Sequence, residues 1–365
     1  MIMTQHIEGI DLYTTYYDDR TRTTMPTSPV DDEDDSTAAV DLRAAQKVVK
    51  TAYHGRRHVR RLEDIGSTSA CCPQYLITLD DDSQLLLRLA PPADVRVLQH
   101  ERDVLSADVE VLELIRQNAP EVPVPDVVLH ESSNRATDTN THTPTSFLLT
   151  THVPGVPLDT ARQQLPDEVL ALLDYELGRH TRQISRITSS RFGLASSSNG
   201  GSAKQYTTWR AAFLSMFESL LRDAEDLFVS VPYEVLRWHV GRLSGALDEV
   251  TVPQLVCCGL TDPRTSVIVD EVTGRLNGLV DFERAVWGDP LMEASFREPS
   301  LAFLSGYGGS PLSAPHARAR ILLYTLYYYL GAVVEVYYHG LNHEYESTAR
   351  KGLVRCLKSL SEYRG

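Results

Sequence analysis

The 365-residue sequence contains little cysteine, no long hydrophobic run and few basic residues. Four of its five cysteines form the adjacent pairs Cys71-Cys72 and Cys257-Cys258, and no C-x-x-C pair occurs. This pattern disfavours a zinc site or a disulfide framework, and it favours reduced, mostly buried cysteines in a cytoplasmic protein. The longest apolar run, residues 321–334, is short for a membrane-spanning helix, which requires about 20 residues.

Positive charge is scarce throughout the chain. The sequence has 35 Lys and Arg against 49 Asp and Glu, which gives a net charge of −14. Neither a nucleic acid nor a membrane is expected as a partner, because both require a basic surface that this composition does not supply. Residues 1–40 contain nine acidic residues and two arginines, and the acidic run at 31–35 repels itself. This segment is predicted to be an acidic, disordered leader.

The pattern changes after residue 40, and hydrophobic residues make up 42% of the chain, enough for a sizeable core. Between residues 41 and 153, short apolar, strand-like stretches predict five strands, and helical spacing predicts a helix at 95–117 after a short one at 41–53. The strands are expected at 59–63, 75–79, 85–89, 127–130 and 147–153.

From residue 154 to 365 the pattern is mainly helical. Helices are expected at about 166–188, 205–228, 233–249, 315–338 and 343–362, with one hairpin at 266–269 and 276–280. The sequence therefore predicts an α+β fold of two lobes. A small N-terminal lobe (41–153) has a five-stranded antiparallel sheet and one helix, and a larger C-terminal lobe (154–365) is mainly helical.

Several short motifs follow one another in a characteristic order. They are Leu85–Leu89, Val122-Pro123-Val124-Pro125, Pro154–Leu158, Arg191-Phe192-Gly193, and Gly278–Glu283 followed by Trp287-Gly288-Asp289-Pro290. In this order and spacing, the sequence from about residue 59 to 338 resembles the aminoglycoside phosphotransferase and choline-kinase-like family. The resemblance implies a bilobal protein-kinase-like fold, transfer of a phosphoryl group from ATP or GTP, and a requirement for Mg²⁺.

The resemblance also assigns roles to residues of the N-terminal lobe. Arg88 would pair with the nucleotide phosphates and with an acidic residue on the following helix, either Asp108 or Glu110. We prefer Asp108 because it lies on the helix face that carries leucine residues. Gly66 and Ser67, between the first two strands, would cover the phosphates, although an ordinary hairpin loop explains this segment equally well.

In the C-terminal lobe the resemblance implies that Asp281, just after the hairpin, binds Mg²⁺, which prefers oxygen ligands. Glu283 and Asp289 are expected to be structural. The glycine-rich segment 305–310 is expected to be a flexible loop near the cleft. The tyrosine-rich helix 321–338 is expected to belong to the core, with an oligomer contact as the alternative.

The catalytic loop departs from the family pattern of His-Gly-Asp followed by Asn five residues after the Asp. In the family, the Asp accepts the proton of the substrate hydroxyl and the Asn binds metal. Aligning the glycine places Leu260 and Thr265 at these two positions, and aligning the following strand places Thr261 and Ser266 there. Neither alignment supplies a carboxylate or an amide. Asp262 could substitute as the base if the loop is shifted by one or two residues, although the Asp-Pro dipeptide is also an ordinary turn.

Two functions therefore remain open. Loss of both catalytic-loop residues predicts a degenerate, pseudokinase-like member with little phosphotransfer, because positioned acid–base catalysis contributes roughly 10²–10⁴-fold. Such a protein would bind a small molecule or peptide in the interlobe cleft, or act as the partner of another enzyme. The alternative is an active ATP-dependent phosphotransferase acting on a small-molecule or peptide hydroxyl, which Arg88, Asp108 and Asp281 keep open.

Overall fold

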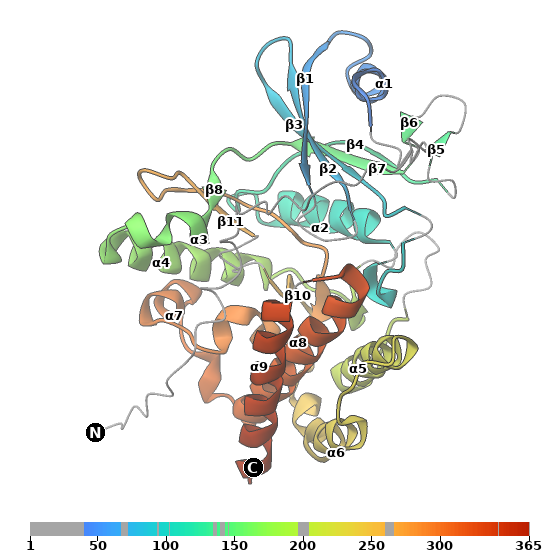
Figure 1. Cartoon of the computed structure of the whole chain (residues 1–365). Coiled ribbons are helices and arrows are strands. Elements are labelled where there is room, and N and C mark those ends of the chain that lie inside the picture. The colour runs from blue at the N-terminus through green and yellow to red at the C-terminus, as the bar shows by residue number, and fades with distance from the viewer. Residues whose placement is uncertain are drawn as a thin grey trace.

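The computed structural model describes residues 40–66, 72–92, 95–101, 103–133, 137–138, 143–144, 146–195, 204–259, 266–341 and 343–364. The predicted leader, apart from residue 40, lies outside the described residues. A lobe built on a β-sheet lies above a larger lobe of helices (Figure 1). The predicted α+β fold of two lobes, with a five-stranded antiparallel sheet in the first, is confirmed.

The sheet of the N-terminal lobe has the strand order β1-β2-β3-β7-β4. Its members are β1 (Val59–Gly66), β2 (Gln74–Leu79), β3 (Gln84–Leu89), β4 (Val127–Glu131) and β7 (Phe147–Thr151). Alternate residues point to opposite faces of a strand. Leu85 and Leu87 therefore pack with α1 (Leu42–Ala52) on one face. Arg88 points to the other face, where it pairs with Asp108 of α2 (Val104–Asn118). Figure 1 shows α2 beneath the sheet. The short helix η1 (Gln99–Glu101) precedes α2, and the small hairpin of β5 (Thr137–Asp138) and β6 (Thr143–Pro144) lies outside the main sheet.

The two lobes meet along a second, three-stranded sheet of β8 (Val156–Pro157), β11 (Val267–Val269) and β12 (Leu276–Leu279). The N–H of Leu279 donates to the carbonyl of Pro123 at 2.7 Å, and the side-chain amide of Asn277 donates to the carbonyl of Pro154 at 2.8 Å. Gly155 has a φ of +127°, and a Cβ there would lie 2.4 Å from a backbone oxygen of β11. Both proline motifs of the sequence thus lie at the crossing between the lobes.

The C-terminal lobe is mainly helical, as predicted, and contains a third sheet that the sequence did not predict. Its helices are α3 (Leu158–Ala161), η2 (Arg162–Gln164), α4 (Asp167–Ile184), α5 (Trp209–Asp226), α6 (Tyr233–Leu243), η3 (Ser244–Glu249), η4 (Pro290–Met292), η5 (Ala294–Phe296), α7 (Leu301–Tyr307), η6 (Pro311–Ser313), α8 (Ala317–His339) and α9 (His343–Glu362). The additional sheet has the order β10 (Gln254–Val256), β13 (Val286–Gly288), β9 (Gly193–Leu194).

Helix α8 belongs to the core of the C-terminal lobe, as its sequence predicts. By length and composition alone it could cross a membrane, but 61% of its most apolar stretch is buried inside the protein. The hydroxyl of Tyr324 on α8 donates to Asp289 at 2.7 Å and accepts from the indole N–H of Trp209 at 2.7 Å. Arg320 donates to the same carboxylate at 2.8 Å. Asp289 thus ties the turn after β13 to α8, which is a structural role.

The expectation of a flexible loop at residues 305–310 is wrong for its first half. Residues 305–307 belong to α7, and the helix ends at Gly308, whose φ of +88° is left-handed. Gly306 allows α7 to pack closely against α4, because a Cβ at this position would lie 1.9 Å from the carbonyl oxygen of Tyr175 on α4. A glycine-rich stretch therefore forms a helix here because the neighbouring helix approaches its backbone directly.

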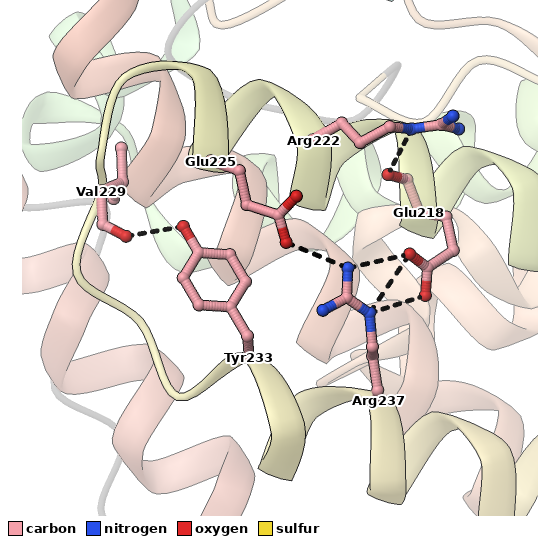
Figure 2. Close-up of polar contacts among 6 residues, drawn as sticks. All are labelled: Glu218, Arg222, Glu225, Val229, Tyr233 and Arg237. Atoms are coloured by element: carbon pink, nitrogen blue, oxygen red, sulfur yellow. Dashed lines mark hydrogen bonds and ion pairs between the residues drawn. The ribbon is translucent and has the colours of Figure 1, made fainter.

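Helices α5 and α6 are joined by a network of ion pairs at the surface (Figure 2). The Arg237 guanidinium on α6 donates to Glu218 and Glu225 on α5, each at 3.1 Å. All three side chains are 40–47% exposed. Exposed pairs of this kind contribute little to stability, typically about 0–1 kcal/mol.

Candidate functional site

An ion-pair cluster connects the two lobes and contains two of the predicted site residues. Arg88 on β3 pairs with Asp108 on α2, and it also donates to Glu283 of the C-terminal lobe at 3.1 Å. The three side chains are only 8%, 2% and 9% exposed, respectively. One buried guanidinium is therefore shared by two buried carboxylates. Asp108 is the acidic residue preferred from the sequence, and Glu110 is half-buried further along the same helix.

The same cluster fixes the backbone beside Asp281. The second carboxylate oxygen of Asp108 accepts a hydrogen bond from the N–H of Phe282 at 3.1 Å, and the Phe282 side chain is buried. Asp281 itself has a φ of +66°, a left-handed conformation that Asp tolerates better than most residues. Non-glycine residues in this region are often found at functional sites. The structure thus brings Arg88, Asp108 and the peptide next to Asp281 together.

The remaining sequence-predicted site residues are only partly described. Gly66 ends β1 with a φ of +81°, and nothing lies within 4 Å of where its Cβ would be. Ser266 is buried, and its carbonyl accepts from the N–H of Val280 at 2.9 Å, so the hairpin that leads to Asp281 begins there. The other site residues, Ser67, Leu260, Thr261, Asp262 and Thr265, lie outside the described residues.

A pocket lies in the C-terminal lobe next to Glu283, and the sequence did not predict most of its lining. Its walls come from β9, α5, the segment 283–297 and α8, and its charged residues are Glu283, Arg284, Arg297 and Glu335. Arg284 donates to Glu335 at 2.7 Å. The Arg297 guanidinium lies 3.7 Å from the centre of the Tyr328 ring, a cation–π contact. The remaining lining is largely apolar and aromatic.

The region that contains both the ion-pair cluster and most of this pocket matches one family model. Residues 73–296, from β2 to the end of η5, match the model described as "Phosphotransferase enzyme family". This match covers more than half of the chain. The chain belongs to this phosphotransferase family. No curated protein matches it, so the family is assigned from the model and the fold.

Solved structures of phosphotransferases share the fold at low sequence identity. A candidate fructosamine-3-kinase from Thermobifida fusca has a TM-score of 0.62 and 17% identity, and the match covers 87% of this chain and 98% of that one. The GDP complex of an aminoglycoside 2'-phosphotransferase-IIIa has a TM-score of 0.57, 15% identity and coverages of 88% and 99%. A macrolide 2'-phosphotransferase from Brachybacterium faecium has a TM-score of 0.50, 18% identity and coverages of 84% and 98%.

In this member of the phosphotransferase family, burial shifts the pKa values of three residues of the pocket toward their neutral forms. Burial and the nearby Arg284 lower the pKa of His100. Burial raises the pKa of the Cys258 thiol and of the Tyr327 hydroxyl. Burial disfavours the charged form of any such group. Among the described cysteines, Cys72, Cys257, Cys258 and Cys356 are free thiols.

A buried pair, Glu101 and His339, connects η1 of the N-terminal lobe to the end of α8. The Nε2 of His339 lies 3.2 Å from the Glu101 carboxylate, which also accepts from the N–H of Leu98 at 2.9 Å. Burial alone would raise the pKa of Glu101, but the hydrogen bond from His339, the charges of both nearby histidines and the Leu98 N–H lower it to about 2. Neither the pair nor its role was apparent from the sequence.

We expect Glu101 to make stability depend on pH in the acidic range. Its pKa falls from an ordinary 4.5 to about 2 on folding, so its contribution is fully present above pH 4.5 and is lost as the pH falls toward 2. The wild type should lose about 2 kcal/mol more than Glu101→Gln between about pH 5 and pH 3. Urea unfolding at each pH measures this difference, and parallel stability curves would contradict the assignment.

Proposed function

We propose that this phosphotransferase-family protein binds a magnesium–nucleotide between its lobes and transfers phosphate to a hydroxyl only slowly. The observation that carries the proposal is the buried Arg88–Asp108 pair, whose carboxylate also holds the peptide beside Asp281. In phosphoryl transfer, the protein mainly positions the nucleotide and spreads stabilising charge around it. Positioning the nucleotide requires a basic residue on β3. Here that residue is Arg88, and its acidic partner on α2, Asp108, is already in contact with it.

The residues around Asp281 fit a magnesium ion that takes its other ligands from phosphate and water. Mg²⁺ commonly binds through one or two carboxylates plus substrate phosphates. Among the residues that the structure describes, no group of three or more His, Cys, Asp or Glu side chains is arranged to hold a metal alone. Asp281 would be the protein ligand, and Arg88 would face the nucleotide. The ion would supply charge neutralisation for the phosphates.

The slow transfer is inferred from the sequence of the loop before β11. The base position is Leu260 when the glycine is aligned and Thr261 when the following strand is aligned. Neither side chain accepts a proton as a carboxylate does at neutral pH. The second metal-ligand position is Thr265 or Ser266. Without both groups, the chemical step should be slower than that of a complete phosphotransferase by a factor on the order of 10²–10⁴.

Thermal unfolding with ATP or GTP, in the presence and absence of Mg²⁺, tests nucleotide binding. A nucleotide at a hundred times its dissociation constant stabilises the folded state by about 2.7 kcal/mol, so we expect a Tm increase of several degrees that requires Mg²⁺. Asp281→Asn should abolish the magnesium-dependent part. Asp226→Asn, at the exposed end of α5, should retain it. A wild type that does not respond to the magnesium–nucleotide would refute the proposal.

An active phosphotransferase is the second candidate, because Arg88, Asp108 and Asp281, which would position the nucleotide and its ion, are all present. Its base would be Asp262, the carboxylate nearest to the altered positions in the sequence. Release of ADP from ATP distinguishes the two. Turnover at a rate normal for the family that is lost in Asp262→Asn would support the active enzyme, whereas slow turnover that is unchanged in this variant supports the first proposal.

A further inference from the structure

The pocket beside Glu283 lies on the C-terminal-lobe side of the ion-pair cluster, where an acceptor would approach the nucleotide. Glu283 belongs to both, since it lines the pocket and accepts from Arg88 at 3.1 Å. Cys258, just before the altered loop, lines the pocket as well. This placement makes the pocket the acceptor side of the site, an assignment that rests on the proposed function.

Each carboxylate of the pocket already has an arginine partner. Glu283 pairs with Arg88, and Glu335 accepts from Arg284 at 2.7 Å. The Glu283 and Glu335 side chains are both only 9% exposed. A polycationic ligand would therefore meet carboxylates that already have partners. The positive charges of Arg284 and Arg297, which also line the pocket, would repel it. The pocket is not suited to such a ligand, although the chain as a whole is acidic.

Arg297 differs from the other charged residues of the pocket. It forms no ion pair with any residue in the described part of the chain, and its guanidinium stacks on the Tyr328 ring at 3.7 Å. The stacking holds the guanidinium in place and leaves its N–H groups available, because a cation–π contact uses the face of the group. A positioned guanidinium with available donors is suited to a planar carboxylate.

The rest of the lining is apolar or aromatic and uncharged. It includes Leu194, Met216, Val286, Met292 and Tyr327. Ligand sites commonly combine such a lining with a few polar groups that fix orientation. An apolar or aromatic body would fill this part of the pocket while an anionic group reaches Arg297.

We propose that this pocket binds a ligand that carries one carboxylate on an apolar or aromatic body, with Arg297 pairing with the carboxylate. The ligand is either a free acid or the C-terminal residue of a peptide, since both present the same group. The Arg297 contact orients the ligand, and the apolar lining of β9, α5 and α8 surrounds its body.

Calorimetric titration with matched probes tests the proposal on the full chain. N-acetyl-phenylalanine should bind at least about tenfold more tightly than N-acetyl-phenylalaninamide, because the two differ in the charge that Arg297 would meet. A tetrapeptide that ends in phenylalanine with a free carboxylate identifies the source: tighter binding than the free acid assigns a peptide, and weaker binding assigns a small molecule. Kanamycin represents the polycationic class and should bind more weakly than the acid.

Variants locate the selectivity at Arg297. Arg297→Met should remove the preference for the acid over the amide, and Arg297→Lys should retain part of it. Arg222→Met, which alters an exposed arginine of α5 (Figure 2), should leave it unchanged. The proposal is overturned if the wild type binds the acid and the amide equally, or if neither binds at millimolar concentration. It is also overturned if kanamycin binds more tightly than the acid, or if Arg297→Met keeps the preference for the acid over the amide. The magnesium–nucleotide response of Arg297→Met is measured separately, so failure of nucleotide binding is distinguished from failure of the pocket assignment.

Discussion

Replacing Arg88 by methionine should lower the free energy of unfolding by about 3–5 kcal/mol, the loss observed when one partner of a buried ion pair is removed. The guanidinium is the shared partner of Asp108 and Glu283, and all three side chains are almost fully buried. Without Arg88, two carboxylates would remain in a low-dielectric environment. Urea unfolding followed by circular dichroism measures the loss. The loss should shrink at acidic pH, because unpaired buried carboxylates take up protons there.

Arg237→Met is a matched control for this experiment. Arg237 also serves two carboxylates, Glu218 and Glu225, but at the surface (Figure 2). Its removal should cost less than about 1 kcal/mol, because water replaces the lost partners. If Arg88→Met and Arg237→Met prove equally mild, burial does not set the strength of the Arg88 cluster.

The second large effect is expected at the crossing of α4 and α7. Gly306→Ala should destabilise the protein by about 3 kcal/mol, the upper part of the usual range for overpacking. The new Cβ would lie 1.9 Å from the Tyr175 carbonyl oxygen and 3.1 Å from the Arg179 nitrogen. Both contacts are to backbone atoms, so the helices must separate, since no side chain can rotate away.

Gly241→Ala provides the comparison for Gly306→Ala. Gly241 lies inside α6, and nothing lies within 4 Å of where its Cβ would be. Because alanine favours a helix over glycine, this variant should be neutral or more stable by up to about 1 kcal/mol. Thermal unfolding of the two variants gives the contrast. A mild effect of Gly306→Ala, comparable to that of Gly241→Ala, would mean that α4 and α7 are not closely packed.

Local sequence patterns predicted the elements that are long enough to show a periodicity. Strand-like stretches predicted β2 and β3 and so placed Arg88 on β3, and helical spacing put Asp108 on the leucine-bearing face of α2. The pair of Arg88 and Asp108 follows from these two patterns together with the family resemblance. The strands of the β10-β13-β9 sheet have only two or three residues each, which is too short for any alternation to be recognised.

Contacts between distant segments could not be predicted in this way. Glu283 is 195 residues from Arg88 in the sequence, and nothing near either residue indicates the other. The pairs Arg284–Glu335 and Glu101–His339 likewise join separate elements. At α7, local composition was misleading. Glycine favours a loop because its backbone is flexible, but this stretch forms a helix because it packs against α4.

Helix α8 forms the core of the C-terminal lobe and also one wall of the pocket, through Tyr327, Tyr328 and Gly331. A substitution on this wall that admitted a different ligand would also disturb packing against α5 and α9. Most residues of the segment 283–297 are buried, but the Arg297 side chain is partly exposed. Redesign of ligand preference should therefore begin with Arg297, where specificity can change at a smaller loss of stability than on α8.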